Sequence, residues 1–185
     1  MKITAQTSLR ELAFIVCNRL IENDIECVLT GGGAATVYAP EAYQSRDLDF
    51  ILSYTSESRL ASAQPLLDLG FVQKQGMYKH SIIPFTVEFP AGPLAIGQEI
   101  ITRWETLDED GLKLNILTPT DCVRDRLAWF LFGKDYSALE QALSVASRHD
   151  IDLDLIRVWC EKEGELPKFE IFSYRLAQLS VRSEA

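Results

Sequence analysis

The first part of the chain alternates between helical and strand-like hydrophobic patterns. Ser8 and Glu11 have the spacing of a capping box, and the apolar residues after them recur at helical intervals, which predicts an amphipathic helix over residues 8–23. The short apolar run at 26–30 ends in glycines and predicts a buried strand. After the glycines, residues 34–38 are compatible with a short helix.

Residues 47–52 alternate strictly, which is typical of a strand with one face in the core. Leu48, Phe50 and Leu52 would point to one side of this strand. Asp47, Asp49 and Ile51 would point to the other side. The two carboxylates are therefore expected to share a face.

The remaining patterns predict further strands and then a helical region. Between residues 58 and 117 the expected elements are a helix at 58–69, a hairpin at 71–83 turning at Gln75-Gly76, and strands at 85–89, 100–104 and 112–117. After Thr118 the expected helices are 119–132, 137–148, 153–163 and 169–179. The predicted fold class is α+β: a small mixed sheet covered by helices (residues 1–117), followed by a helical region packed on it (118–185).

Composition limits the classes of function. The chain has 185 residues, 47% of them hydrophobic, which suits one ordinary domain with a proper core. It shows neither a secretion signal nor an apolar run long enough to span a membrane, so we expect a cytoplasmic protein. A net charge of −9 disfavours general binding to nucleic-acid backbones and is compatible with an acidic site that collects divalent cations.

The glycine cluster Gly31-Gly32-Gly33 follows the predicted buried strand. Glycines at such a junction allow a tight turn and a close approach of the backbone to a ligand, and the helix that follows presents free N–H groups to a phosphate. Taken alone, such a cluster is more often a plain turn.

Asp47 and Asp49 form the second candidate element. On a strand their Cα atoms lie roughly 6.6 Å apart. Carboxylates about 5 Å apart repel by roughly 3 kcal/mol at an effective dielectric constant of 20, so the pair calls for a counter-ion, either a basic side chain or a divalent cation. Mg²⁺ usually binds one or two carboxylates together with substrate phosphates. The alternative is a solvated strand face.

Glu88 is the third candidate, in the middle of the predicted strand 85–89. If this strand pairs beside 47–52, a third carboxylate joins Asp47 and Asp49, and three acids could hold two metal ions. Otherwise Glu88 lies on an open, solvated face.

Taken together, these elements resemble the DNA polymerase beta-like nucleotidyltransferase superfamily. The matching segments, in the order the superfamily has them, are Leu29-Thr30-Gly31-Gly32, Asp47-Leu48-Asp49-Phe50 and Val87-Glu88-Phe89. Gly31 to Ala34 and Ser45 to Asp49 are most similar to the abortive-infection and toxin–antitoxin nucleotidyltransferases. The segment from Asp121 to Gln141, with Arg126, Lys134 and Asp135, is similar to the helical region that follows the core in those proteins.

The resemblance implies a role for each of these residues. Gly31 and Gly32 would contact nucleotide phosphates, and Asp47 and Asp49 would bind Mg²⁺ or Mn²⁺. Glu88 would be the third carboxylate, where the superfamily more often has aspartate. Ser45 and Lys134 would assist in binding the nucleotide, with Asp135 as a supporting acid; a turn-capping serine and a solvated helix start are the alternatives.

The function that follows from the resemblance is metal-dependent transfer of a nucleoside monophosphate from an NTP to an acceptor hydroxyl. The acceptor could be tRNA, a protein or a small molecule, in a toxin–antitoxin or phage-defence setting with a cognate toxin or antitoxin as partner. The alternative is a non-catalytic antitoxin or regulatory module with the same fold. A third possibility is an α+β domain whose acids are only surface charge.

Overall fold

The first helix begins at the capping box. In the computed structural model, which describes residues 2–53, 55–56, 60 and 63–183, helix α1 spans Leu9–Ile21. The Glu11 backbone N–H donates to Ser8 Oγ at 3.2 Å, and the Ser8 N–H donates to the Glu11 carboxylate at 2.7 Å. These two bonds satisfy two of the N–H groups that a helix start leaves free, so the predicted start is confirmed.

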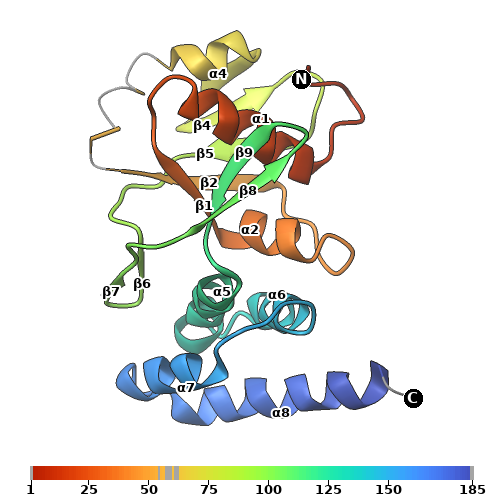
Figure 1. Cartoon of the computed structure of the whole chain (residues 1–185), viewed down its shortest axis with the longest axis vertical. Coiled ribbons are helices and arrows are strands. Elements are labelled where there is room, and N and C mark those ends of the chain that lie inside the picture. Colours follow the sequence, from red (N-terminus) through yellow and green to blue (C-terminus); the bar gives the residue numbers. More distant parts are fainter. Residues whose placement is uncertain (1, 54, 57–59, 61–62, 184–185) are drawn as a thin grey trace.

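The sheet has seven strands in the order β3-β4-β5-β2-β1-β9-β8 (Figure 1). Its strands are β1 (Cys27–Thr30), β2 (Asp47–Leu52), β3 (Phe71–Lys74), β4 (Met77–His80), β5 (Thr86–Glu88), β8 (Glu105–Glu109) and β9 (Leu112–Ile116). The pairs β1–β9 and β2–β5 are parallel, and the other pairs are antiparallel. The sheet is therefore mixed, as predicted.

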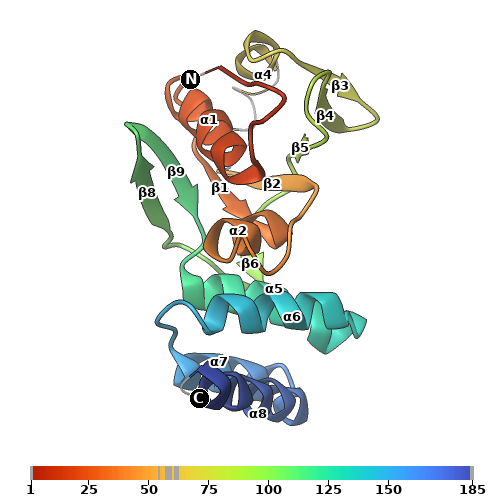
Figure 2. The same ribbon diagram turned by 90° about the vertical axis from the view of Figure 1, so that its right-hand side faces the viewer.

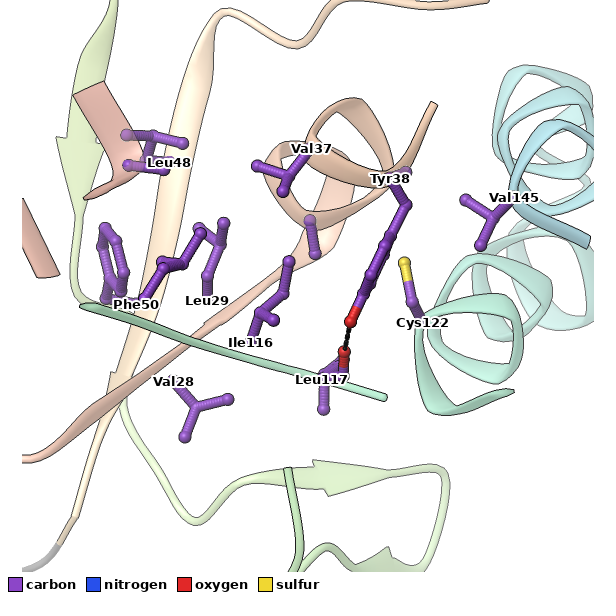
Figure 3. Packing of buried hydrophobic residues seen from close by; sticks show 14 of the residues in the cluster. Val28, Leu29, Val37, Tyr38, Leu48, Phe50, Ile116, Leu117, Cys122 and Val145 are labelled. Carbon is purple, nitrogen blue, oxygen red and sulfur yellow. Dashed lines mark hydrogen bonds between the residues drawn. The ribbon is translucent and has the colours of Figure 1, made fainter. Parts of the chain in front are cut away.

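Helices α1 and α2 (Gly31–Tyr38) pack against the central strands and bury one face of the sheet (Figure 2). Leu29, Leu48, Phe50 and Ile116 are fully buried in this layer. Figure 3 shows these side chains on the α2 side of the strands and Val28 on the other side. The Tyr38 hydroxyl donates to the Leu117 carbonyl at 2.6 Å and ties α2 to the chain leaving β9. The core of the sheet region lies on this face.

The C-terminal part is helical, as the sequence predicts. Its helices are α5 (Pro119–Gly133), α6 (Tyr136–Ala146), α7 (Leu153–Lys162) and α8 (Leu166–Ser183). Helices α5 and α6 pack on α2, and α7 and α8 pack on each other farther from the sheet (Figures 1 and 2). None of the described helices is long and apolar enough to cross a membrane.

Two expectations about the elements need correction. Helix α2 begins at Gly31, not at residue 34, so the glycines form its first turn; every residue of α2 is buried, and this packing overrides the poor helix propensity of glycine. The prediction of a strand at 100–104 is wrong. There, β6 (Ala95–Ile96) and β7 (Glu99–Ile100) form a small separate hairpin, and the next strand of the main sheet is β8.

Strand β8 is absent from the sequence prediction because it is a polar edge strand. It pairs antiparallel with β9 through a turn at Asp110 and Gly111, both with positive φ. An Asp-Gly pair is a strong hairpin signal and could have indicated this strand.

Of the helix predicted at 58–69, the structure has α4 at Gln64–Asp68. Residues 58, 59, 61 and 62 lie outside the described residues. The hairpin predicted at 71–83 is confirmed as β3 and β4, with Gln75 and Gly76 at its turn.

Candidate active site

A polar cleft of about 480 Å³ lies where the β1–α2 junction, strand β2, the α5–α6 helices and the segment before β6 meet. Five of the residues predicted to bind metal or nucleotide line this cleft: Gly31, Gly32, Ser45, Asp47 and Asp49. Residues separated along the sequence therefore converge on one site.

The strand register places the three acids on one face of the sheet. Asp49 pairs with Glu88 on β5 and with Thr30 on β1, and Asp47 pairs with Thr86. Directly opposed residues in a sheet point to the same side, so the expectation that 85–89 lies beside 47–52 is confirmed. Glu88 is half-buried on the neighbouring strand and is not among the residues that line the cleft.

Burial and neighbouring negative charge destabilise the ionised form of Asp49. Its pKa is raised to about 6, first by desolvation and then by the charges of Asp47 and Glu88, while Arg126 acts in the opposite direction. Within the described residues, no hydrogen bond or ion pair involves the Asp49 carboxylate. A cation beside Asp47 and Asp49 would relieve this repulsion.

The glycine turn is shaped by its close approach to Asp49. Gly31 has φ +69°, and a Cβ atom at this position would lie 2.7 Å from Asp49 Oδ2. At Gly32 a Cβ atom would lie 3.0 Å from Ser45 Oγ. Glycine is needed at position 31 for its backbone conformation and for the space that the carboxylate occupies.

Ser45 holds Asp47 in place. Its side chain is buried, and Oγ donates to Asp47 Oδ1 at 2.5 Å. The Ser45 backbone N–H donates to the hydroxyl of Thr36 in α2 at 2.9 Å, which anchors the loop before β2. The serine predicted to assist the nucleotide thus lies in the cleft and orients one of the acids.

Asp125, on α5, is a site residue that the sequence interpretation missed. Its Oδ2 accepts a hydrogen bond from the Gly31 N–H at 3.2 Å and two from Arg126, at 3.0 Å from Nε and 2.6 Å from Nη2. The Asp125 carboxylate therefore already accepts the hydrogen bond that the Gly31 N–H donates. No local pattern marks Asp125, because its partner Gly31 is 94 positions away.

Arg126 is the basic side chain that lines the cleft in the described part of the chain. Lys134, predicted to contact the nucleotide, caps the C-terminal end of α5 with an exposed side chain and is not a cleft residue. Its neighbour Asp135 does line the cleft, and it caps α6 by accepting from the Ser137 N–H at 2.8 Å.

Gln141, on α6, has a buried polar atom that the protein does not satisfy. The side chain is 5% exposed and lines the cleft, and its Oε1 has no hydrogen-bond partner among the described residues. Such an atom costs about 1–3 kcal/mol in a folded protein. Its position next to Gly32 is typical of a group that awaits a ligand.

The donor set is compatible with a hard divalent cation bound together with a phosphate. Among the described residues, no three His, Cys, Asp or Glu side chains form a ready-made metal site. Mg²⁺ does not require one, since it binds through one or two carboxylates plus substrate oxygens. Asp47 and Asp49 supply those carboxylates.

No protein-family model matches the sequence, and no curated protein is significantly similar to it. Among solved structures, an antigenic nucleotidyltransferase-like protein from Paracoccidioides brasiliensis superimposes with a TM-score of 0.56 at 16% identity, covering 77% of both chains. The chain therefore has the fold of a nucleotidyltransferase-like protein. Two structures of ANT(2″)-Ia, one with adenylyl-2″-tobramycin, match with a TM-score of 0.49 at 10% and 11% identity. They cover 92% and 95% of this chain and 98% and 96% of their own.

Proposed function

We propose that this protein transfers a nucleoside monophosphate from an NTP to an acceptor hydroxyl, with Mg²⁺ or Mn²⁺ as cofactor. The observation that carries the proposal is the cleft in which Asp47 and Asp49 face the glycine turn at the start of α2. The nucleotidyltransferase-like fold supports it independently, because its evidence comes from the whole backbone and not from these residues.

In the proposed reaction the acceptor oxygen forms a bond to the α-phosphorus while the bond from that phosphorus to the bridging oxygen breaks. Pyrophosphate leaves, and the hydroxyl proton passes to a base. A bound divalent cation would polarise the phosphate oxygens and neutralise charge on the departing pyrophosphate.

The residues of the chain then have distinct roles. Asp47 and Asp49 hold the cation, and Ser45 keeps Asp47 oriented through its 2.5 Å hydrogen bond. The N–H of Gly32 and the guanidinium of Arg126 contact the phosphates. Glu88, which pairs with Asp49 across the β2–β5 register, takes the proton of the hydroxyl.

The setting of the reaction is also proposed. A cytoplasmic toxin–antitoxin or phage-defence role, with a cognate toxin or antitoxin protein as partner, is supported by the similarity of Gly31–Ala34 and Ser45–Asp49 to that group. Lys134 would join the nucleotide site if its side chain turned toward Asp135.

A second candidate function is a non-catalytic module that binds nucleotide. Two hydrogen bonds favour it: Ser45 Oγ donates to Asp47, and the Gly31 N–H donates to Asp125. Both donors are therefore already bonded within the protein and do not contact a phosphate. This candidate requires nucleotide binding without transfer.

Calorimetric titration with Mg·ATP and Mg·GTP, followed by incubation with α-labelled NTP, tests the proposal. We expect millimolar or tighter binding that depends on the metal and is lost in Asp49→Ala. Asp150→Ala, which removes an exposed aspartate elsewhere, is the matched control and should bind as the wild type does.

The outcomes separate the candidates. Transfer of label to an acceptor supports the enzyme, and metal-dependent binding without transfer to any acceptor supports the module. If Asp49→Ala binds and transfers as the wild type does, the residue assignment is wrong. If neither NTP nor Mg²⁺ binds at millimolar concentration, both candidates fail.

A further inference from the structure

A second hollow, of about 410 Å³, lies beside the polar cleft and differs from it in chemistry. Its lining is mostly apolar and includes Val28, Ile51, Leu94, Ile100, Ile101 and Trp104. We call it the apolar groove. Its volume falls in the range of small-molecule sites.

The apolar groove is continuous with the polar cleft. Ile51, Pro93 and Leu94 line both. Ile51 is two residues beyond Asp49 on β2 and therefore lies on the same face of the strand, roughly 6.6 Å farther along. A molecule in the groove can reach the carboxylates without leaving the protein surface.

The two hollows lie at opposite ends of the catalytic strand face. The glycine turn contacts β2 near Ser45 and Asp49, which is the end proposed for the triphosphate. β1 and β2 run antiparallel, so Val28 pairs with Ile51 farther from the turn. The groove therefore lies on the side of Asp49 from which an acceptor can approach the α-phosphorus.

The wall of the groove is held by the C-terminal helices. The Ile101 N–H donates to the Leu94 carbonyl at 2.9 Å and closes the base of the β6–β7 hairpin. Glu99 in this hairpin forms ion pairs with Arg124 of α5 and Lys162 of α7. A wall anchored in this way keeps the groove open before a ligand binds.

The charge of the surroundings restricts the occupant. Glu26 is the charged residue in the described lining of the groove, and the carboxylates of Asp47 and Asp49 line the adjoining polar cleft. Neither hollow offers the row of cations that a nucleic-acid backbone needs. Ile100, at the rim of the groove, is 58% exposed.

We infer that the apolar groove is the acceptor site and that the acceptor is a small molecule with an apolar body, neutral or cationic, carrying the reactive hydroxyl. This inference rests on the proposed function. The apolar body lies against Val28, Ile51 and Trp104, and the hydroxyl reaches Asp49, beside which Glu88 lies on strand β5. Its oxygen then bonds to the α-phosphorus of the NTP, pyrophosphate leaves, and the proton passes to Glu88.

Three probes with one indole body and different charge test the inference: tryptophol (neutral), tryptamine (cationic) and indole-3-acetate (anionic). Each is titrated into the protein with isotope-labelled isoleucine methyl groups and followed by NMR. We expect tryptophol and tryptamine to bind with dissociation constants on the order of 1 mM, as fragments of this size do. The signals of Ile51, Ile100 and Ile101 should shift. Indole-3-acetate should bind at least about tenfold more weakly, because the nearby carboxylates repel it.

Two exposed isoleucines provide a matched pair of variants. Ile100→Asp places a charge at the rim of the groove, whereas Ile82→Asp makes the same change at a 49% exposed isoleucine that is not part of the groove lining. We expect Ile100→Asp to weaken tryptophol binding by about fivefold or more and Ile82→Asp to leave it unchanged.

The outcomes distinguish this inference from the proposed function, which is tested by Mg·NTP titration of the wild type. Equal tryptophol binding by the two variants, preferential binding of indole-3-acetate, or no probe binding overturns the inference while Mg·NTP binding stands. Competition between ATP without metal and tryptophol would assign the groove to the nucleobase and also overturn it. Groove binding without any Mg·NTP binding supports the ligand site but overturns its acceptor role together with the proposed function.

Discussion

The two faces of strand β2 serve different purposes. Leu48 and Phe50 point to one face, where they are fully buried beneath the helices. Asp47, Asp49 and Ile51 point to the other, where they are half-buried and line the two hollows. The inner face stabilises the fold, and the outer face accepts an electrostatic cost at the candidate site. Because side chains alternate along this six-residue strand, the residues that stabilise the fold and those of the candidate site lie on opposite faces.

The largest expected effect concerns the inner face. Phe50→Ala should lower the free energy of unfolding by about 3–5 kcal/mol, because it leaves a cavity in a fully buried layer. Phe50 also stacks on Phe89 at a centroid distance of 6.3 Å. Urea denaturation provides the measurement. Phe132→Ala, at a 56% exposed phenylalanine, is the control and should change stability by less than about 0.5 kcal/mol. Equal losses in the two variants would contradict the assignment of the core.

A smaller effect of opposite sign is expected on the outer face. The folded pKa of Asp49, about 6, lies above its ordinary value of 3.8. The folded state therefore keeps this proton more tightly than the unfolded state, and ionisation between about pH 4 and 6 opposes folding. Without divalent cations, Asp49→Asn should be more stable than the wild type by about 1–3 kcal/mol at pH 7. This gain should disappear near pH 4.

Urea denaturation at a series of pH values measures the difference. If Asp49→Asn is no more stable than the wild type at neutral pH, ionisation of Asp49 does not destabilise the folded state, and the outer face carries no electrostatic cost.

The smallest expected effect is a difference in stability between two glycine variants, one in the glycine turn and one elsewhere. Gly31→Ala and Gly111→Ala both place alanine at a positive φ, which costs about 1–2 kcal/mol. Only at Gly31 would the new Cβ atom meet Asp49; at Gly111 it has no neighbour within 4 Å. Gly31→Ala should therefore be less stable by about a further 1 kcal/mol and should also lose Mg²⁺ binding. Thermal denaturation and metal titration of both variants test this, and identical behaviour would exclude a functional close approach.

Several features were predictable because they depend on neighbours in the chain. The capping box at Ser8, the turn at Gln75 and the helices after Thr118 all follow from local rules of geometry. The shared face of Asp47 and Asp49 follows from the period of a strand.

The segment 100–104 shows why the rest was not predictable. Its apolar residues indicate a strand by pattern, but Ile100, Ile101 and Trp104 instead line the apolar groove. Local hydrophobicity reports that a residue meets an apolar partner. It does not report whether that partner is the core of the protein or a ligand.

The sequence by itself determined the order of the glycine turn and the acids, and the strand face on which Asp47 and Asp49 lie. The tertiary structure alone decided which groups lie near them: Glu88 through the β2–β5 register, Asp125 on helix α5, 94 positions after Gly31, and the apolar groove beside Ile51. The reason is physical. Side-chain direction within a strand is set by local backbone geometry, whereas register and cleft walls result from packing between distant segments.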